Sequence, residues 1–308
     1  MNDHQRMFLV GDNPFHGISH LSQERARARG KKAASPEGAA ELVLTALQSG
    51  ANGFTFSVSD LTLSILRFMR KRRSGKLDLY GMVPYAFEYV RTATQTGTPG
   101  LAKRLARQIV MSGDPGAIAI GMKAAITMNP SDLLSTYLTY EISRVRSSAS
   151  GEMNLVSLLL NETVTDMALA LNLDWLFESY VRFLSRRSII PGFNTRNFPF
   201  FVRKFREWDM DTSHILVATP FNKAGFQMNP SKQECEKTLG DLPSSIVLAI
   251  SILAAGYLKP LEAIDYVATL PNVKGVAVGI SKEKHALETF KTLEGKMLKS
   301  KIGNYQQS

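Results

Sequence analysis

Polar side chains gather in the turns that follow short apolar runs of this chain. The densest such turn is GDNPFHGISH, directly after the first run, and it holds two of the five histidines. Its Asp12 and His16 suit a base and its partner, so we expect catalysis or substrate binding there, with a purely structural turn as the alternative. His16 and His20 have a metal-ligand spacing only in a helix, which Pro14 and Gly17 disfavour, so no metal is predicted.

A second acidic group follows the fourth apolar run. Glu162 comes after NLVSLLLN, where packing does not explain a carboxylate, although capping of the following helix would. Paired with Asp12 or His16 it would form a general acid/base couple of the kind that abstracts a proton next to a carbonyl. The amides beside these acids, Asn13 and Asn161, are predicted to bind substrate.

Cations follow the fifth and sixth runs. Arg196 is a natural clamp for an anion. Lys223 lies past a proline, in the loop, which favours an electrostatic role toward an anionic substrate over a Schiff base. The other predicted substrate-binding residues at these turns are Tyr85, Asn194 and Asn222.

Small residues follow the last two runs. Gly256 and Gly279 would let backbone N–H groups approach a phosphate, and a helix that starts near Ser281 and Lys282 would point its positive end at it. The alternative is two tight turns that need glycine only for their geometry.

Eight apolar runs precede these turns, and between them lie mostly helical stretches. Near-continuous Val, Ile and Leu is typical of parallel strands buried on both faces. Eight such strands predict an α/β fold, a (β/α)8 TIM barrel in which the C-terminal strand ends surround one pocket. The runs are 8–11, 53–58, 77–83, 154–160, 188–193, 214–219, 245–251 and 273–279.

One connection is much longer than a barrel needs. We predict a single domain over 1–308 with a helical insertion at about 86–151, after the third strand. The insertion would cover the catalytic mouth or form a contact between copies in a homo-oligomer. Helices are further expected over 36–49, 60–73, 166–187, 198–208, 260–270 and 282–299, and the stretch NKAGFQMNPSKQE is expected to be a loop.

The overall composition excludes several classes of protein. The net charge of +10 invites a nucleic-acid partner, but the basic residues are spread out and do not interleave with aromatic ones, so we expect none. No apolar run is long enough to cross a bilayer, and the N-terminus has no signal-peptide pattern, which favours a cytoplasmic protein without membrane contact. The single Cys235 excludes an intramolecular disulfide.

The stretch 245–288 resembles the end of aldo/keto reductase-like barrels. SIVLAISILAAGYL is similar to their seventh strand and turn, and VKGVAVGISKEKHALETF to their eighth strand and cofactor-phosphate segment. The resemblance implies that Ser281, Lys282 and His285 contact the tail of NADP. It also implies an Asp and a Tyr after strand two, a Lys ending strand three, and a His or Glu ending strand four. Asp60 and Glu162 fill two of these places, and the Lys and Tyr are not matched.

Three hypotheses follow. The favoured one is an aldolase-type lyase or an isomerase that acts on a small phosphorylated or anionic metabolite, with Asp12, His16 and Glu162 as acid/base groups and no required cofactor. The second is an NAD(P)-dependent oxidoreductase related to the aldo/keto reductases, with a rearranged proton donor. The third is a barrel without catalysis that binds or assembles with other molecules.

Overall fold

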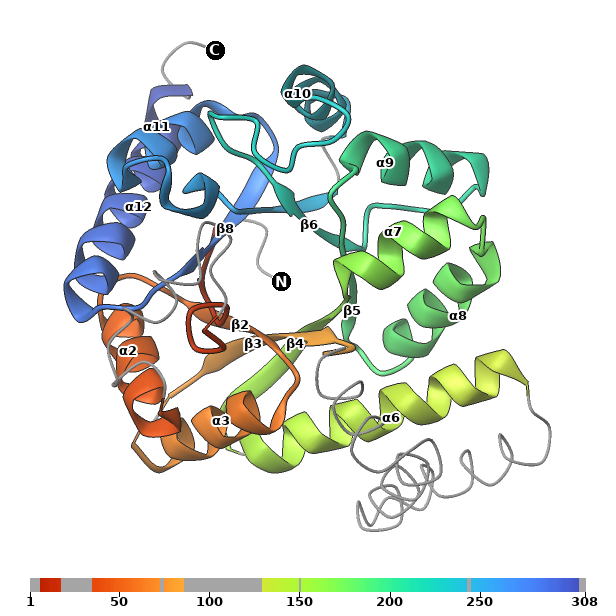
Figure 1. Cartoon of the computed structure of the whole chain (residues 1–308), viewed down its shortest axis with the longest axis horizontal. Helices are drawn as coiled ribbons and strands as arrows, with labels where there is room; N and C mark the ends of the chain where they lie inside the picture. Colours follow the sequence, from red (N-terminus) through yellow and green to blue (C-terminus); the bar gives the residue numbers. More distant parts are fainter. Residues whose placement is uncertain are drawn as a thin grey trace.

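Eight parallel strands close into a barrel in the order in which they occur along the chain (Figure 1). The computed structural model describes residues 6–17, 35–72, 75–85, 129–149, 151–242 and 245–304. The predicted TIM barrel is therefore confirmed. The strands are β1 (Met7–Gly11), β2 (Gly53–Ser57), β3 (Leu77–Val83), β4 (Met153–Leu160), β5 (Ile190–Asn194), β6 (Leu216–Pro220), β7 (Ile246–Ile250) and β8 (Val273–Gly279).

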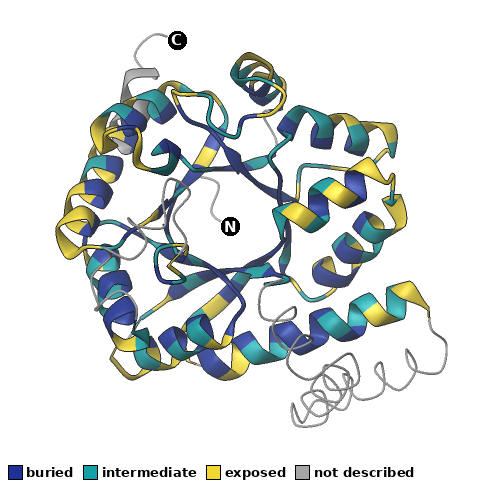
Figure 2. Ribbon diagram, in the orientation of Figure 1, coloured by how far each residue is buried: buried dark blue, intermediate teal, exposed yellow. Residues whose placement is uncertain are grey.

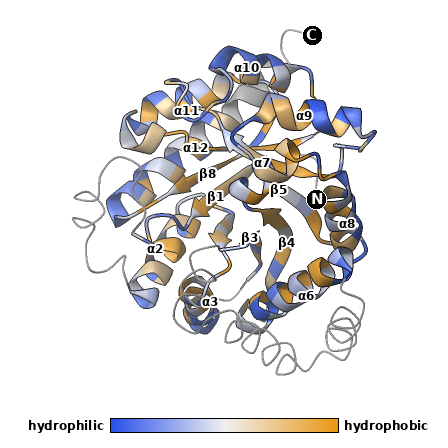
Figure 3. Cartoon of the chain, turned by 45° about the vertical axis from the view of Figure 1, so that its right-hand side comes forward, coloured by the Kyte–Doolittle hydropathy of each residue, from blue (hydrophilic) through white to orange (hydrophobic). Residues whose placement is uncertain are grey.

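The strands are buried on both faces, as their apolar composition predicts. In β1, Phe8 and Val10 belong to the core between the sheet and the helices, whereas Met7 and Leu9 belong to a second cluster inside the barrel. Figure 2 shows buried residues on the strands and on the helix faces turned toward them, and Figure 3 shows the apolar sheet inside a more polar shell. The fold thus has an outer core between strands and helices and an inner core within the barrel, to which every strand except β2 contributes.

Helices surround the barrel and begin at local sequence signals. The side chain of Ser35 caps the first described helix by accepting a hydrogen bond from Gly38 N at 3.1 Å, and Pro36 follows as the first helical residue. The helices are α2 (Pro36–Gln48), α3 (Asp60–Arg72), α6 (Pro130–Ala149), α7 (Glu162–Ala170), α8 (Asp174–Ser185), α9 (Phe198–Glu207), α10 (Lys232–Gly240), α11 (Pro260–Thr269) and α12 (Glu283–Asn304), with a 3-10 turn η1 (Ala254–Gly256).

Two helix predictions need correction. The helix expected over 166–187 is two helices, because Asn172 adopts a left-handed conformation (φ 55°) that ends α7 before α8 begins. The stretch expected to be a loop ends at Glu234 and includes the first three residues of α10, which Ser231 caps by accepting from Glu234 N at 3.2 Å. Ser231 and Glu234 have the Ser-x-x-Glu spacing of a capping box, which is a helix-start signal in the sequence.

The predicted insertion contains one regular barrel element. Helix α6 packs against α3 and α8 on the outside of the barrel, the position of the helix that joins β3 to β4 (Figure 1). Residues 86–128 and 150 of the predicted insertion lie outside the described residues. The single domain and the role of the insertion stay predictions.

Closure of the barrel requires a residue without a side chain on β8. Met7 of β1 pairs with Gly275, where an added Cβ would lie 2.6 Å from Met7 Cβ and 2.8 Å from Met7 O. Both atoms are fixed by the strand pairing and cannot move aside easily.

We therefore expect Gly275→Ala to lower the free energy of unfolding by about 1–3 kcal/mol, the typical cost of overpacking. Chemical denaturation measures the change. The matched control is Gly295→Ala in α12, where an added Cβ meets nothing within 4 Å, so stability should rise by about 0.5–1 kcal/mol. Equal effects of the two substitutions would contradict the role of Gly275 in closure.

Candidate active site

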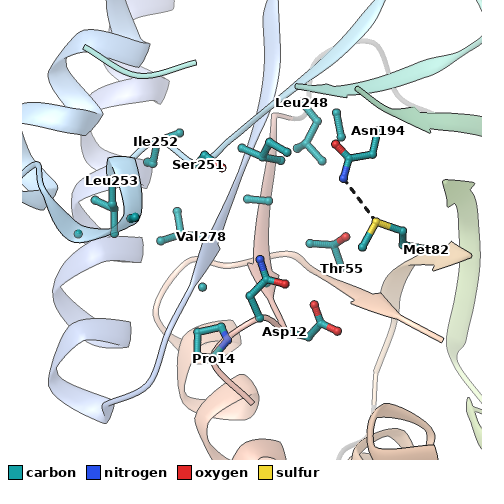
Figure 4. A pocket seen from close by; sticks show the side chains of 18 of the residues that line it. Asp12, Pro14, Thr55, Met82, Asn194, Leu248, Ser251, Ile252, Leu253 and Val278 are labelled. Atoms are coloured by element: carbon teal, nitrogen blue, oxygen red, sulfur yellow. Dashed lines mark hydrogen bonds between the residues drawn. The ribbon is translucent and has the colours of Figure 1, made fainter. Parts of the chain in front are cut away.

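A cavity of about 340 Å³ lies over the C-terminal end of the barrel, and every strand contributes to its lining. Its volume is in the range of small-molecule sites. The floor is made of inward-facing strand residues, and the wall on one side comes from the loops after β7 and β8 (Figure 4). The lining from the strands is Gly11, Thr55, Met82, Leu159, Asn194, Ala218, Leu248, Ile250, Ala277, Val278 and Gly279.

Six of the predicted site residues line this cavity. The position that barrel geometry predicts for the pocket agrees with the structure, since the six come from turns far apart in the sequence. His285, which the resemblance implied as a cofactor contact, lines the cavity as well. The six are Asp12, Asn13, Asn194, Gly256, Gly279 and Ser281.

Asp12 and His16 form a buried pair after β1. Nε2 of His16 lies 3.0 Å from Oδ2 of Asp12, and the same oxygen accepts a hydrogen bond from Ser57 N at 2.7 Å. The side chains are 5% and 4% exposed for Asp12 and His16. The His16 ring contacts the Tyr85 ring, with centroids 4.8 Å apart. The turn therefore places the Asp12 carboxylate at the edge of the cavity, where contacts with His16 and Ser57 N hold it in position.

Asn194 ends β5 with a buried acceptor that has no hydrogen-bond partner among the described residues. Its Nδ2 donates to Sδ of Met82 at 3.5 Å (Figure 4), whereas its Oδ1 is buried and accepts no hydrogen bond within the described part of the chain. The residue is 8% exposed. A buried carbonyl oxygen without a donor costs about 1–3 kcal/mol, so the protein retains an unfavourable group in a cavity wall.

The loops after β7 and β8 form the small-residue wall of the cavity. Ala254, Ala255 and Gly256 follow one another with φ of 45°, 60° and 93°, a left-handed stretch that is strained for the two alanines. Gly279 is required for packing, because an added Cβ would lie 2.9 Å from the Pro14 ring. Ser281 lines the cavity just before α12 begins.

Glu162 and Arg196, predicted for acid/base chemistry and anion binding, pair with each other and do not line the cavity. Nη2 of Arg196 donates to Oε1 of Glu162. The backbone N–H of Arg196 and the hydroxyl of Thr195 both donate to the carboxylate of Asp166. Burial raises the pKa of Asp166, and these two hydrogen bonds partly offset that effect.

Other residues that were predicted to bind substrate have structural contacts instead. Asn222 is fully buried, and its amide both donates to Phe226 O and accepts from Phe226 N at 2.8 Å. Lys223 pairs with Glu262 at 2.7 Å. The side chain of Asn161 caps α7. These three residues, together with the exposed Lys282 and with Tyr85, do not line the cavity.

Sequence reasoning missed several lining residues within the strands. Thr55 and Met82 point into the barrel from the middle of β2 and near the end of β3, and Ser251 follows β7 with φ 53°. The two-residue period of a strand places alternate residues on one face, but it does not tell which of the two faces lies inside the barrel.

Within the described ranges, no three His, Cys, Asp or Glu side chains come together to hold a metal ion. None of the helices searched there has the length and apolar composition needed to span a membrane. His20 lies outside these ranges.

Comparison with known proteins gives likeness of structure without likeness of sequence. No protein-family model and no curated protein matches the chain. A proposed aldo-keto reductase of Pseudomonas aeruginosa superposes with a TM-score of 0.55 at 11% identity, covering 94% of this chain and 90% of that one. A second structure of a proposed aldo-keto reductase from that organism gives a TM-score of 0.55 at 12% identity, with 94% and 90% covered.

A third solved structure supports the same fold. It is MGS-M4, an aldo-keto reductase enzyme from a Medee basin deep-sea metagenome library, with a TM-score of 0.50 at 10% identity, covering 89% of this chain and 88% of that one. The chain therefore has an aldo-keto reductase-like TIM barrel fold, as the resemblance of its last two strands implied.

The favoured prediction of a lyase or an isomerase is wrong. The three solved structures named above carry the name aldo-keto reductase, two of them as a proposed assignment, which agrees with the second hypothesis instead. The geometry supplies a physical reason, because the expected acid/base trio is not assembled. Asp12 borders the cavity, whereas Glu162 is paired with Arg196 outside its lining.

Asn13 and Asn222 allow a test of binding against structural roles. We expect Asn222→Ala to cost about 1–3 kcal/mol of stability, because two backbone groups lose their partners, with unchanged ligand affinity. Asn13→Ala, at an exposed position in the lining, should leave stability within about 0.5 kcal/mol and weaken ligand binding. Denaturation and titration with NADPH measure both; weakened binding in Asn222→Ala would restore its predicted binding role.

Proposed function

We propose that this protein is an NAD(P)H-dependent oxidoreductase of aldo-keto reductase-like type that reduces a small carbonyl compound. In this proposal the nicotinamide end of the cofactor enters the cavity at the barrel mouth, and its phosphates lie at the loops after β7 and β8. When bound, the cofactor supplies the hydride; the residues of this chain bind it, orient it and exclude water.

The observation that carries the proposal is the unpartnered Oδ1 of Asn194. A buried acceptor in a cavity wall is satisfied when a ligand brings a donor. A primary carboxamide, such as that of nicotinamide, offers two N–H donors on a flat ring. The apolar lining around it, including Leu248 and Leu159, suits the faces of such a ring.

The opposite wall supports binding of the phosphates. Ser281 can donate its hydroxyl, and the N-terminus of α12, which begins two residues later, carries a partial positive charge. Gly256 adds no side chain to this wall, which leaves its backbone open to an approaching anion. No lysine or arginine is among the described lining residues, so a phosphate there depends on backbone and hydroxyl donors.

The protein departs from the family at the proton donor. In aldo-keto reductase-like barrels a lysine is expected at the end of strand three. In this protein the side chain that lines the cavity near the end of β3 is that of Met82, and its thioether has no proton to donate. The proposed reduction therefore needs a different donor.

Titration with NADPH tests the proposal directly. We expect NADPH or NADH to raise the melting temperature in proportion to the logarithm of its excess over Kd. Flavin mononucleotide and inorganic phosphate serve as comparisons at equal concentration. Stabilisation by flavin alone, or by none of these ligands, would contradict a nicotinamide cofactor.

Asn194→Leu separates binding from stability. The substitution removes a buried unpartnered oxygen, so stability should be unchanged or higher, while loss of one hydrogen bond should weaken NADPH about tenfold. Calorimetric titration and thermal denaturation measure the two effects. The matched control is Asn154→Leu, at an exposed position near the N-terminal end of β4 and away from the cavity, which should not alter the affinity for NADPH. An unaltered affinity in Asn194→Leu would remove the main support for the proposal.

A further inference from the structure

We propose that Asp12, braced by His16, is the group that exchanges the proton with the substrate oxygen. This inference rests on the proposed reductase function and assigns the role left open by the missing Tyr and Lys.

Asp12 is the one carboxylic acid among the described lining residues. The other titratable side chain in that lining is His285, which is exposed in the first turns of α12 beside Ser281. His285 thus belongs to the wall proposed for the phosphates. Asp12 borders the floor instead, with Thr55 between it and Asn194 in the view of Figure 4. A substrate carbonyl next to the nicotinamide ring would therefore lie near Asp12.

The two oxygens of Asp12 have different surroundings. Oδ2 accepts hydrogen bonds from Ser57 N and from Nε2 of His16, whereas Oδ1 makes no hydrogen bond to another described residue. A carboxylate oxygen that already accepts two donors is the poorer site for a proton. The exchanged proton therefore belongs on Oδ1.

His16 is placed to stabilise the charge that remains after the transfer. Because an ionised Asp12 is only an acceptor, Nε2 of His16 must carry the hydrogen in their contact. The ring is held by Tyr85 and its side chain is 4% exposed. His16 is a positioning residue: it orients Asp12 and does not line the cavity.

In the direction of reduction, a bound reduced nicotinamide would supply the hydride to the carbonyl carbon, and the π electrons of the C=O bond would become a lone pair on oxygen. That oxygen would take the proton from Oδ1 of Asp12 and become a hydroxyl. Asp12 would be left as a carboxylate, stabilised by Ser57 N and His16, and a solvent hydronium ion would return the proton to Oδ1.

Asp12→Asn tests the inference because the amide keeps the shape and its oxygen can still accept from Ser57 N and His16. We expect NADPH to bind within about threefold of the wild-type Kd, measured by calorimetry, while kcat for NADPH-dependent reduction of 4-nitrobenzaldehyde and glyceraldehyde falls at least about 100-fold. Asp241→Asn, at an exposed residue after α10, is the matched control and should retain both properties.

His16→Gln provides a second variant. The glutamine amide can donate to Oδ2 and leaves Oδ1 able to carry the proton, so kcat should fall no more than about tenfold. A larger loss than in Asp12→Asn would show that His16 itself transfers the proton and would overturn the inference. Thermal denaturation of both variants excludes unfolding as the cause of a loss.

The outcomes distinguish this inference from the proposed function. Wild-type protein that neither binds NADPH nor reduces either aldehyde would overturn both. Binding and turnover in the wild type, with kcat retained in Asp12→Asn, would overturn the inference alone. A Kd for NADPH that rises in Asp12→Asn as much as kcat falls would assign Asp12 to binding and likewise overturn it.

Discussion

Pairing of the first strand with the last is the constraint on which the rest of the structure depends. Residues Met7–Gly11 lie in register with Gly275–Gly279, and this pairing closes the barrel. Backbone hydrogen bonds of a closed sheet leave no edge unpaired, so the ring holds the loops at fixed positions. The turn that carries Asp12 and the turn that carries Ser281 become neighbours although they lie at opposite ends of the chain. The same contact explains why Gly279 has no side chain, since Pro14 occupies that space.

Several groups in the cavity wall are unfavourable for the folded protein alone. Asn194 buries an acceptor without a donor, and two alanines of η1 adopt left-handed conformations. Each feature costs free energy that the rest of the barrel must offset. Asn194 and Ala255 line the same cavity although one ends β5 and the other lies in the turn after β7, a distribution that packing does not explain. A ligand that supplies the missing donor recovers part of this cost on binding.

Among the described residues, the two cations expected to bind an anion at the site are paired with carboxylates outside the cavity lining. Arg196 pairs with Glu162, and Lys223 pairs with Glu262 on the exposed surface. The described lining contains neither arginine nor lysine. An arginine or lysine after a barrel strand therefore does not by itself indicate an anion-binding site, because its side chain can form an ion pair with a nearby carboxylate.

The sequence by itself determined the eight strands, most helix starts and the end of the barrel at which the cavity lies. The strands could be predicted because near-continuous apolar runs occur in few architectures, those in which a strand is buried on both faces. The helix starts could be predicted because a cap such as Ser35 interacts with residues only a few positions away. Tertiary structure decided which side chains face the cavity and which form hydrogen bonds or ion pairs with one another. When both faces of a strand are apolar, its alternation does not tell which face is inside the barrel, so Met82 and Thr55 could not be distinguished from their neighbours. The pairing of Glu162 with Arg196 and the isolation of Asn194 Oδ1 likewise depend on the register between strands, which sequence spacing does not encode.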